Sequence, residues 1–427
     1  MTIKALIPLV SLLTMTLLPS QGRAALELIS VGLGGAQPNG DSYVAGPAVA
    51  GGRYLTFESD ASNLVSGDTN RERDIFVRDR VSKKTLLISV GLHGAQSNGS
   101  SSYPVISEDG RFVVFQSYAN NLVPGDTNNK LDVFVRDLEA CITSRVSIDS
   151  DERQANGLSG LPQISPDGRF VTFQSAASNL VATDTNSVDD IFLRDRQVGR
   201  TYRVSLGDNF SQANDRSEWP ALSADGDQIA FYSYASNLVT DDTNGFVDIF
   251  VRDRRSRTVN RASLPQAGGQ ANGHSETPSI TPSGRFVVFT SYASNLVPND
   301  TNDVGDIFVR DLLKNKTNRV SLGTNFTQAS GASSYPTISA SGMRIAFVSE
   351  AKLSPIDTNN YADIYLRDRI AKSTKLISIG QRGQAANLYS MDPHIAADGK
   401  TIAFASIATN LLPGATTQVM RVYLAIP

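Results

Sequence analysis

The sequence contains little cysteine and little excess charge of either sign. Cys141 is the single cysteine among 427 residues, which excludes an intramolecular disulfide and a cysteine-rich zinc site. Lys and Arg number 39 against 42 Asp and Glu, so the net charge is −3, which excludes a strongly basic nucleic-acid-binding protein. No segment shows a sustained helical period with capping residues, and hydrophobic residues at 40% exclude a wholly disordered chain. These absences favour a globular protein built from strands.

The first 24 residues have the features of a secretory signal peptide. Lys4 precedes an apolar run over residues 5–18, and the small residues Gly22 and Ala24 follow at the spacing of a cleavage site. The run is shorter than the roughly 20 residues that cross a bilayer, and no second apolar run of that length follows. We therefore expect cleavage near Ala24 and a mature chain of residues 25–427 that is periplasmic or secreted and has no transmembrane anchor.

One unit is repeated seven times along the mature chain. Each copy contains the pattern Gly-x-x-x-x-Phe, and successive phenylalanines are 58 residues apart, or 57 in the last interval. These phenylalanines are Phe57, Phe115, Phe173, Phe231, Phe289, Phe347 and Phe404. Repetition at this period predicts that residues 25–427 form one domain of similar, adjacent units.

Each repeat is expected to form four short strands. In the second copy these are residues 104–107, 111–117, 132–137 and 144–148, with an Asp-Gly turn after the first strand and a long polar loop after the second. Four strands repeated roughly every 40–60 residues are typical of a β-propeller. The sequence therefore predicts an all-β, seven-bladed β-propeller with four strands per blade.

The two ends of the mature chain supply complementary parts of one blade. The seventh copy stops after its third strand, at residues 420–426. Residues 26–31 precede the first copy and match the fourth strand of another copy, at residues 86–90. We expect the N-terminal strand 26–31 to complete the last blade, because a closed ring leaves no exposed sheet edge.

Two segments carry a resemblance to a known family. Residues 106–115, with the sequence Ile-Ser-Glu-Asp-Gly-Arg-Phe-Val-Val-Phe, and residues 164–173 resemble the WD-repeat-like units of TolB-type bacterial β-propellers. The resemblance extends over nearly the whole mature chain. It implies a periplasmic or secreted propeller that binds a partner.

Six of the seven copies carry a polar loop with the pattern Asp-Thr-Asn-x-x-x-Asp. The acidic and amide residues are Asp68, Asn70, Asp74, Asp126, Asn128, Asp132, Asp184, Asn186, Asp190, Asp242, Asn244, Asp248, Asp300, Asn302, Asp306, Asp357, Asn359 and Asp363. Oxygen ligands at positions one, three and seven of the pattern are typical of part of a calcium loop. The alternative is that these side chains cap backbone N–H groups in a tight turn, and six copies favour this structural role.

Two further polar elements recur in the repeats. A Gln-x-Asn loop, as at Gln154 and Asn156, offers amide groups that can bind a polar ligand or hold adjacent blades together. Seven blades each need such a seam, so the sequence favours the second role. An Arg-Asp pair ends the third strand, as at Arg136 and Asp137, and predicts an inter-blade network rather than a basic binding stripe, since each Arg comes with an Asp.

Residues that break the repeat are the candidates for a single binding site. His93 and His274 are expected in the inter-blade loops of the polar face. Histidines at the channel mouth can hold a metal and abstract a proton, as in some propeller lyases, but the sequence favours scattered surface positions for these two and for His394. Trp219 precedes a repeated proline and is expected either to stack on a sugar near the channel or to pack in the core. No nucleophile elbow, zinc-protease motif or phosphate loop occurs.

These features predict a monomeric, non-enzymatic propeller that binds an envelope protein or a glycan on its loop-rich face. The alternative is a polysaccharide lyase or hydrolase with its site at the central channel mouth, which requires polar residues confined to one or two blades with shifted pKa values. A weaker alternative is a calcium-dependent adhesion protein or envelope scaffold. Calcium is the one cofactor that the sequence suggests, and no nucleic-acid partner is expected.

Overall fold

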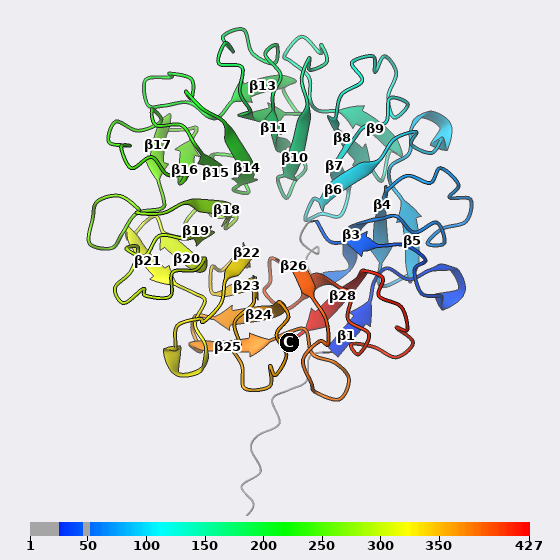
Figure 1. The fold of residues 1–427 in the computed structure, drawn as a ribbon. Helices are drawn as coiled ribbons and strands as arrows, with labels where there is room; N and C mark the ends of the chain where they lie inside the picture. Colours follow the sequence, from blue (N-terminus) through cyan, green and yellow to red (C-terminus); the bar gives the residue numbers. More distant parts are fainter. Residues whose placement is uncertain (1–24, 46–51) are drawn as a thin grey trace, which may run out of the picture.

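Seven four-stranded antiparallel sheets form a ring around a central axis (Figure 1). The structure, a computed structural model, describes residues 25–45 and 52–427. The signal peptide predicted for residues 1–24 lies outside these described residues. The ring confirms the prediction of an all-β, seven-bladed propeller with four strands per blade. We number the blades 1–7 along the chain.

The blades share one strand order, from the channel outwards. The innermost strands are β2 (Ser42–Tyr43), β6 (Ser101–Ile106), β10 (Ser159–Ile164), β14 (Ser217–Leu222), β18 (Ser275–Ile280), β22 (Ser333–Ile338) and β26 (Ser390–Ile395). The second strands are β3 (Tyr54–Ser59), β7 (Phe112–Ser117), β11 (Phe170–Ser175), β15 (Gln228–Ser233), β19 (Phe286–Ser291), β23 (Arg344–Ser349) and β27 (Ile402–Ser406).

The two outer strands of each blade complete the sheets. The third strands are β4 (Asp74–Asp79), β8 (Asp132–Asp137), β12 (Asp190–Asp195), β16 (Asp248–Asp253), β20 (Asp306–Asp311), β24 (Asp363–Asp368) and β28 (Arg421–Ile426). The fourth strands are β5 (Lys84–Leu87), β9 (Ile142–Arg145), β13 (Arg200–Arg203), β17 (Thr258–Arg261), β21 (Lys316–Arg319), β25 (Ser373–Leu376) and β1 (Ala25–Leu28). Short 3-10 turns occur at η1 (Leu33–Gly35), η3 (Leu92–Gly94) and η4 (Thr324–Phe326). Among the described residues, no helix has the length and apolar character of a membrane span.

The fourth strand of blade 2 lies earlier in the chain than the sequence suggested. It was expected at residues 144–148 but spans Ile142–Arg145. The cause is the carboxylate of Asp137, which accepts hydrogen bonds from the N–H groups of Glu139 and Ala140 at 2.9 and 3.0 Å. This cap closes a short turn, so the chain re-enters the sheet within a few residues. Ser147 lies beyond the strand, and its hydroxyl bonds to Asp132.

The chain ends close the ring as predicted. Strand β1 pairs antiparallel with β28, with Ala25 opposite Ile426 and Leu28 opposite Tyr423. In Figure 1 the first and last strands lie side by side in one blade. The pairing covers only Ala25–Leu28, because the chain then turns away to enter blade 1. Ile29 is fully buried at this junction.

Replacing Glu27 with glutamine is expected to lower the free energy of unfolding by about 1 kcal/mol, near the upper end for partly exposed ion pairs. Glu27 in β1 accepts hydrogen bonds from Arg80 at 2.8 and 2.7 Å and from Lys83 at 2.9 Å, which connects blade 7 to blade 1. Urea unfolding measures this loss, and Glu139→Gln is the control because the side chain of Glu139 is 74% exposed. Equal stability of the two variants would show that this contact does not contribute to closure.

The hydrophobic core lies between neighbouring blades. In every blade an aromatic ring of the second strand stacks on one of the third, as Phe115 does on Phe134 with a centroid distance of 5.9 Å. Phe115 also shares a buried cluster with Ile75 and Val77 of the preceding blade. Each such ring contributes roughly 1.5–3 kcal/mol when it is removed from water. These strands are apolar on both faces because a blade is covered on both sides.

Candidate functional site

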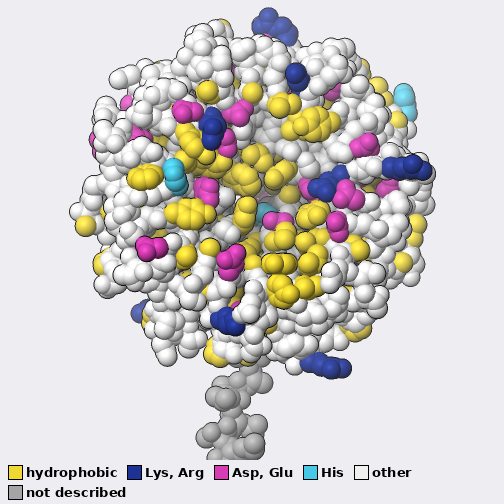
Figure 2. All heavy atoms as spheres, in the orientation of Figure 1, with side chains coloured by type: hydrophobic (Ala, Val, Ile, Leu, Met, Phe, Trp, Pro, Cys, Tyr) yellow, Lys and Arg dark blue, Asp and Glu magenta, His cyan; other side chains and the backbone are white. Residues whose placement is uncertain are grey.

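The inner strands surround a cavity of about 540 Å³ on the axis of the ring. The described residues that line this cavity come from all seven blades. Figure 2 shows hydrophobic side chains gathered where one face of the molecule is hollowed at its centre, with acidic and basic side chains around them. A concave, largely apolar cavity with a few polar groups is the usual form of a ligand site.

A β-bulge in six of the inner strands turns one side chain toward the cavity. In β6 the pairing with β7 shifts register between Ser102 and Val105, where Pro104 has no N–H to give to the ladder. The bulged residues, which all precede a proline and have φ between 49° and 58°, are Tyr103, Leu161, Trp219, Thr277, Tyr335 and Asp392. Non-glycine residues rarely adopt this left-handed conformation, and such strained positions cluster at functional sites.

Three of the bulged residues form an aromatic cluster across the cavity. Trp219 of blade 4 lies edge-on to Tyr103 of blade 2 with a centroid distance of 6.3 Å, and is 6.4 Å from Tyr335 of blade 6. Tyr103 and Tyr335 keep 38% and 47% of their surface exposed, so their rings can contact a ligand. Exposed aromatic rings of this kind are suited to stacking against the apolar face of a sugar.

Ionisable side chains gather on the wall formed by blades 7 and 1. Asp392 and His394 belong to β26, and Glu58 belongs to β3 of the next blade. One oxygen of Glu58 accepts the N–H of Tyr103 at 2.7 Å, and the other accepts Arg73 at 3.0 Å. The carboxyl of Asp392 has no hydrogen bond or ion pair among the described residues.

The surroundings shift the pKa values of these three groups away from their ordinary range. Burial, reinforced by the nearby charge of Glu58, raises the pKa of Asp392 to about 7. Burial lowers the pKa of His394 to about 4, so its imidazole is neutral at pH 7. Burial also raises the pKa of Glu58, although the Tyr103 N–H and Arg73 oppose this effect. A protonated carboxyl beside a second, hydrogen-bonded carboxylate is an arrangement that supports acid–base chemistry.

The candidate histidines predicted from the sequence do not form this site. His93 is exposed in η3 and does not line the cavity. His274 accepts the N–H of Val247 at 3.0 Å through Nδ1 and packs edge-on against Phe246, which holds a loop in place. Trp219 does line the cavity. His394, which was expected to be a scattered surface residue, lies in the cavity wall, so that expectation was wrong.

The sequence analysis missed Asp392 and Glu58, whereas Tyr103 and Tyr335 precede the repeated proline as Trp219 does, where an aromatic ring was expected to stack on a sugar or to pack in the core. The same position marks Asp392, since the residue before the repeated proline differs between copies while its neighbours recur. At this position the repeat carries aromatic, aliphatic, hydroxyl and acidic residues, and only blade 7 carries an acid, Asp392. A search for variable positions inside the repeat would have found it.

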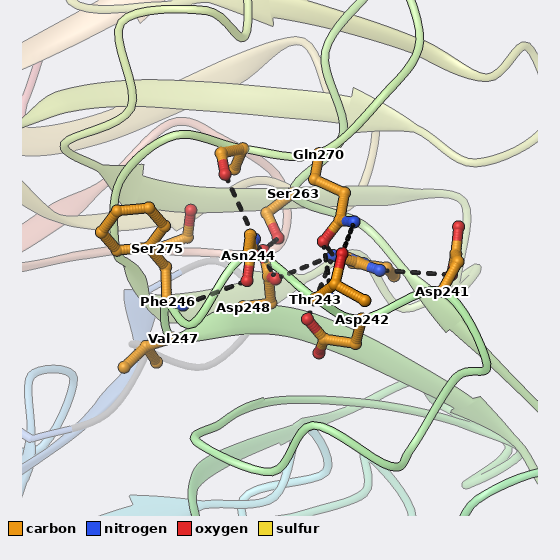
Figure 3. A network of polar contacts seen from close by, with 12 residues as sticks. Asp241, Asp242, Thr243, Asn244, Phe246, Val247, Asp248, Ser263, Gln270 and Ser275 are labelled. Carbon is orange, nitrogen blue, oxygen red and sulfur yellow. Dashed lines mark hydrogen bonds and ion pairs between the residues drawn. The ribbon is translucent and has the colours of Figure 1, made fainter.

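The Asp-Thr-Asn loops form a dense polar network, drawn for blade 4 in Figure 3. Asp248 accepts Asn244 at 2.9 Å and the hydroxyl of Ser263. A guanidinium nitrogen of Arg261 lies 3.1 Å from Asp248 and 3.4 Å from Asp242. The positive charge of Arg261 therefore lies between the two loop carboxylates, at the position that the calcium alternative gave to a metal ion.

The blades differ in what neutralises these loops. Arg145, Arg203 and Arg319 take the place of Arg261 in blades 2, 3 and 5. Blades 1 and 6 have leucines at the same register, Leu87 and Leu376. Within residues 25–45 and 52–427, no group of three or more His, Cys, Asp or Glu side chains is arranged to hold a metal ion. Calcium binding by these loops stays a prediction, and we assign no metal-dependent step to the protein.

The Gln-x-Asn loops connect neighbouring blades. Gln154 donates to the hydroxyl of Thr127 in the loop of blade 2 at 2.7 Å. The N–H of Asn156 donates to Asn179 in the loop of blade 3 at 3.0 Å. Each linker is thus bonded to the blade before it and to the blade after it, which is the seam role that the sequence favoured.

The fold is similar to that of known enzymes. An oligogalacturonate lyase from Vibrio parahaemolyticus matches with a TM-score of 0.58 and 12% identity, over 95% of this chain and 97% of that chain. An oligogalacturonate lyase in complex with manganese matches with a TM-score of 0.58 and 11% identity, over the same shares of the two chains. The β-propeller domain of the Trilobed protease from Pyrococcus furiosus matches with a TM-score of 0.53 and 12% identity, over 87% of this chain and 90% of that chain.

The resemblance to TolB-type propellers is supported only as membership of the propeller fold. TolB from Acinetobacter baumannii matches with a TM-score of 0.41 and 14% identity, over 88% of this chain and 80% of that chain, which is too weak to carry an argument. No protein-family model matches the chain, and no curated protein matches it in sequence.

The expectation of a non-enzymatic binding module was wrong. A chain that is almost wholly such a propeller can be a lyase, as the match to oligogalacturonate lyase shows for that protein. Three acid–base groups of the cavity lining that have shifted pKa values, Asp392, His394 and Glu58, also come from two adjacent blades, 7 and 1, as the enzymatic alternative requires.

Proposed function

We propose that this protein is a glycan-cleaving enzyme, a polysaccharide lyase or hydrolase whose site is the mouth of the central channel. The observation that carries the proposal is the cluster of Asp392, His394 and Glu58, with its shifted pKa values, on the wall of the cavity of about 540 Å³ at the centre of the ring. Support comes also from the aromatic rings beside it and from the similarity in fold to oligogalacturonate lyase.

Hydrolysis is the reaction that the paired carboxyls support best. Glycosidases use one protonated carboxyl to donate a proton to the glycosidic oxygen and one carboxylate to activate water or attack the sugar. Asp392, with a pKa of about 7, has the properties of the acid. Glu58 is fixed by Arg73 and the Tyr103 N–H and would accept the proton of the water that replaces the leaving group.

Elimination is the second candidate, and His394 is the observation that favours it. A lyase needs a base that abstracts a proton next to the uronate carboxyl of its substrate. Burial lowers the pKa of His394 to about 4, so its imidazole is in the unprotonated state that a base requires at neutral pH, and it is a weaker base than an exposed histidine. Asp392 could then protonate the leaving oxygen in either reaction.

The experiment that tests the proposal incubates the chain of residues 25–427 with a panel of neutral, amino-sugar and uronate polysaccharides. Both reactions release new reducing ends, whereas elimination alone also produces the ultraviolet absorbance of an unsaturated uronate. We expect reducing ends from at least one polymer. Release from none of them, at any pH between 5 and 8, would contradict the proposal.

The rate is expected to follow a bell-shaped pH profile. Asp392 must be protonated to act as the acid, so kcat/KM should fall about tenfold per pH unit above its pKa of about 7. Glu58 must be ionised, and burial raises its pKa, so the acidic limb should lie above the usual range of a glutamate. Initial rates at saturating and limiting substrate between pH 4 and 9 measure both limbs. A rate that stays constant up to pH 9 would exclude Asp392 as the proton donor.

A further inference from the structure

Acidic groups dominate the channel mouth, and its basic groups are already paired. Glu58 and Asp392 line the cavity, and Glu276 lies close enough to the lining residue Tyr335 to raise the pKa of its hydroxyl. Glu276 also accepts a hydrogen bond from Tyr292. No guanidinium or ammonium group among the described residues neutralises Asp392 or Glu276.

Arg73 of the cavity lining and Arg216, which precedes the inner strand β14, are already bound to other groups of the protein. Arg73 donates to both oxygens of Asp60 at 2.9 and 2.8 Å and to Glu58 at 3.0 Å. Arg216 pairs with Glu218 at 2.9 Å and lies over the ring of Tyr234. A carboxylate on a ligand would have to displace these protein carboxylates before it could contact either guanidinium.

The apolar part of the mouth does not discriminate between charged and neutral ligands. Trp219, Tyr103 and Tyr335 present ring faces and edges, which pack against the C–H groups of a sugar whatever its net charge. Discrimination by charge therefore falls to the acidic residues, because like charges brought together repel and opposite charges attract.

We propose that the substrate is a glycan without carboxylate or sulfate groups, built from neutral or amino sugars. This inference rests on the proposed function and names the substrate class of the same site. A uronate chain would place its carboxylates beside Glu58 and Glu276, and beside Asp392, which is partly ionised at pH 7, without an unpaired cation to bind them. The inference also favours hydrolysis over elimination, since elimination needs the uronate carboxyl to acidify the proton that is removed.

The single tryptophan of the chain provides a direct binding signal, because Trp219 lies in the mouth itself. The test titrates the chain of residues 25–427 with three hexasaccharides of equal length, one neutral, one of glucosamine and one of galacturonate, at pH 7 and low salt. We expect the fluorescence of Trp219 to change with the first two, and their Kd to be at least tenfold lower than that of the galacturonate hexamer.

A pair of charge variants separates the mouth from the rest of the surface. Glu276→Gln should narrow the difference in Kd between neutral and galacturonate hexamers, because it removes one repelling charge. Glu139→Gln is the matched control, since its exposed side chain lies in a turn between β8 and β9, away from the cavity lining, and it should leave all three Kd values unchanged.

The outcomes distinguish this inference from the proposed function. Cleavage or tight binding of the galacturonate hexamer in preference to the others would overturn the substrate class while leaving the enzyme proposal intact. Binding of the neutral or glucosamine hexamer without cleavage of any polymer would uphold the charge selectivity and overturn the enzyme proposal. Absence of any change in fluorescence with all three sugars would overturn both.

Discussion

The Asp392→Asn variant is expected to cleave its glycan about 100- to 10,000-fold more slowly than the natural protein, the usual contribution of a positioned general acid. Asparagine has the same size and tolerates the left-handed backbone, with φ of 53° at this position. It cannot release a proton at any pH of interest. The measurement is kcat/KM at pH 6, below the pKa of about 7, where the natural carboxyl is mostly protonated.

Asp398→Asn is the matched control for this variant. Asp398 lies in the same blade, is exposed in the turn between β26 and β27, and its Oδ1 accepts the N–H of Lys400 at 2.9 Å, which an amide oxygen preserves. Its rate should equal that of the natural protein. Both variants should melt at the natural temperature or above it, so a slow Asp392→Asn enzyme would be a folded one. An undiminished rate in that variant would remove Asp392 from the mechanism.

The ring could be predicted from the sequence because its determinants are periodic. Phe115 and its six equivalents recur at a nearly constant interval, and every copy places them in the same inter-blade core. Closure could be predicted because residues 26–31 repeat a fourth strand that the last copy lacks. The length of this pairing could not, because the path of the chain after Leu28 depends on its packing into blade 1.

The site could not be predicted because its members come from opposite ends of the chain and from irregular backbone. Glu58 and Asp392 meet only when blade 7 closes against blade 1. A residue before proline normally adopts an extended conformation, so Asp392 and Trp219 gave no sign that a bulge aims them at the channel. The shifted pKa values follow from burial in the cavity, which a sequence pattern does not reveal.

The Asp-Thr-Asn loops illustrate a second limit of the sequence. Asp242 and Asp248 have the spacing of calcium ligands, and the loop alone contains nothing to neutralise them. The compensating charge, Arg261, comes from the fourth strand and reaches them only through the pairing of β16 with β17. The spacing of two carboxylates in one loop is therefore suited to binding a guanidinium as well as a metal ion.

Replacing Arg261 with leucine is expected to cost about 3–5 kcal/mol of the free energy of unfolding at pH 8, the usual result of removing one partner from a buried ion pair. The side chains of Arg261, Asp242 and Asp248 are only 3%, 4% and 0% exposed, so water cannot replace the lost charge. Leucine fits the position, since blade 6 carries Leu376 at the same register. The loss is therefore one of charge rather than of packing, and denaturant unfolding measures it.

The stability of the Arg261→Leu variant should also depend on pH. Blade 6, which naturally has leucine in place of this arginine, indicates the direction. There, without an arginine, burial raises the pKa of Asp363 to about 7. A carboxyl whose pKa is raised by folding stabilises the folded state fully below its unfolded pKa of roughly 4, and this contribution is lost as the pH rises through the folded value. The deficit should therefore be smaller at pH 5 than at pH 8. Arg255→Leu, in the same blade with a side chain 79% exposed, should lose no more than about 1 kcal/mol at either pH. A deficit in Arg261→Leu that matched this control would show that the loop carboxylates do not depend on the guanidinium.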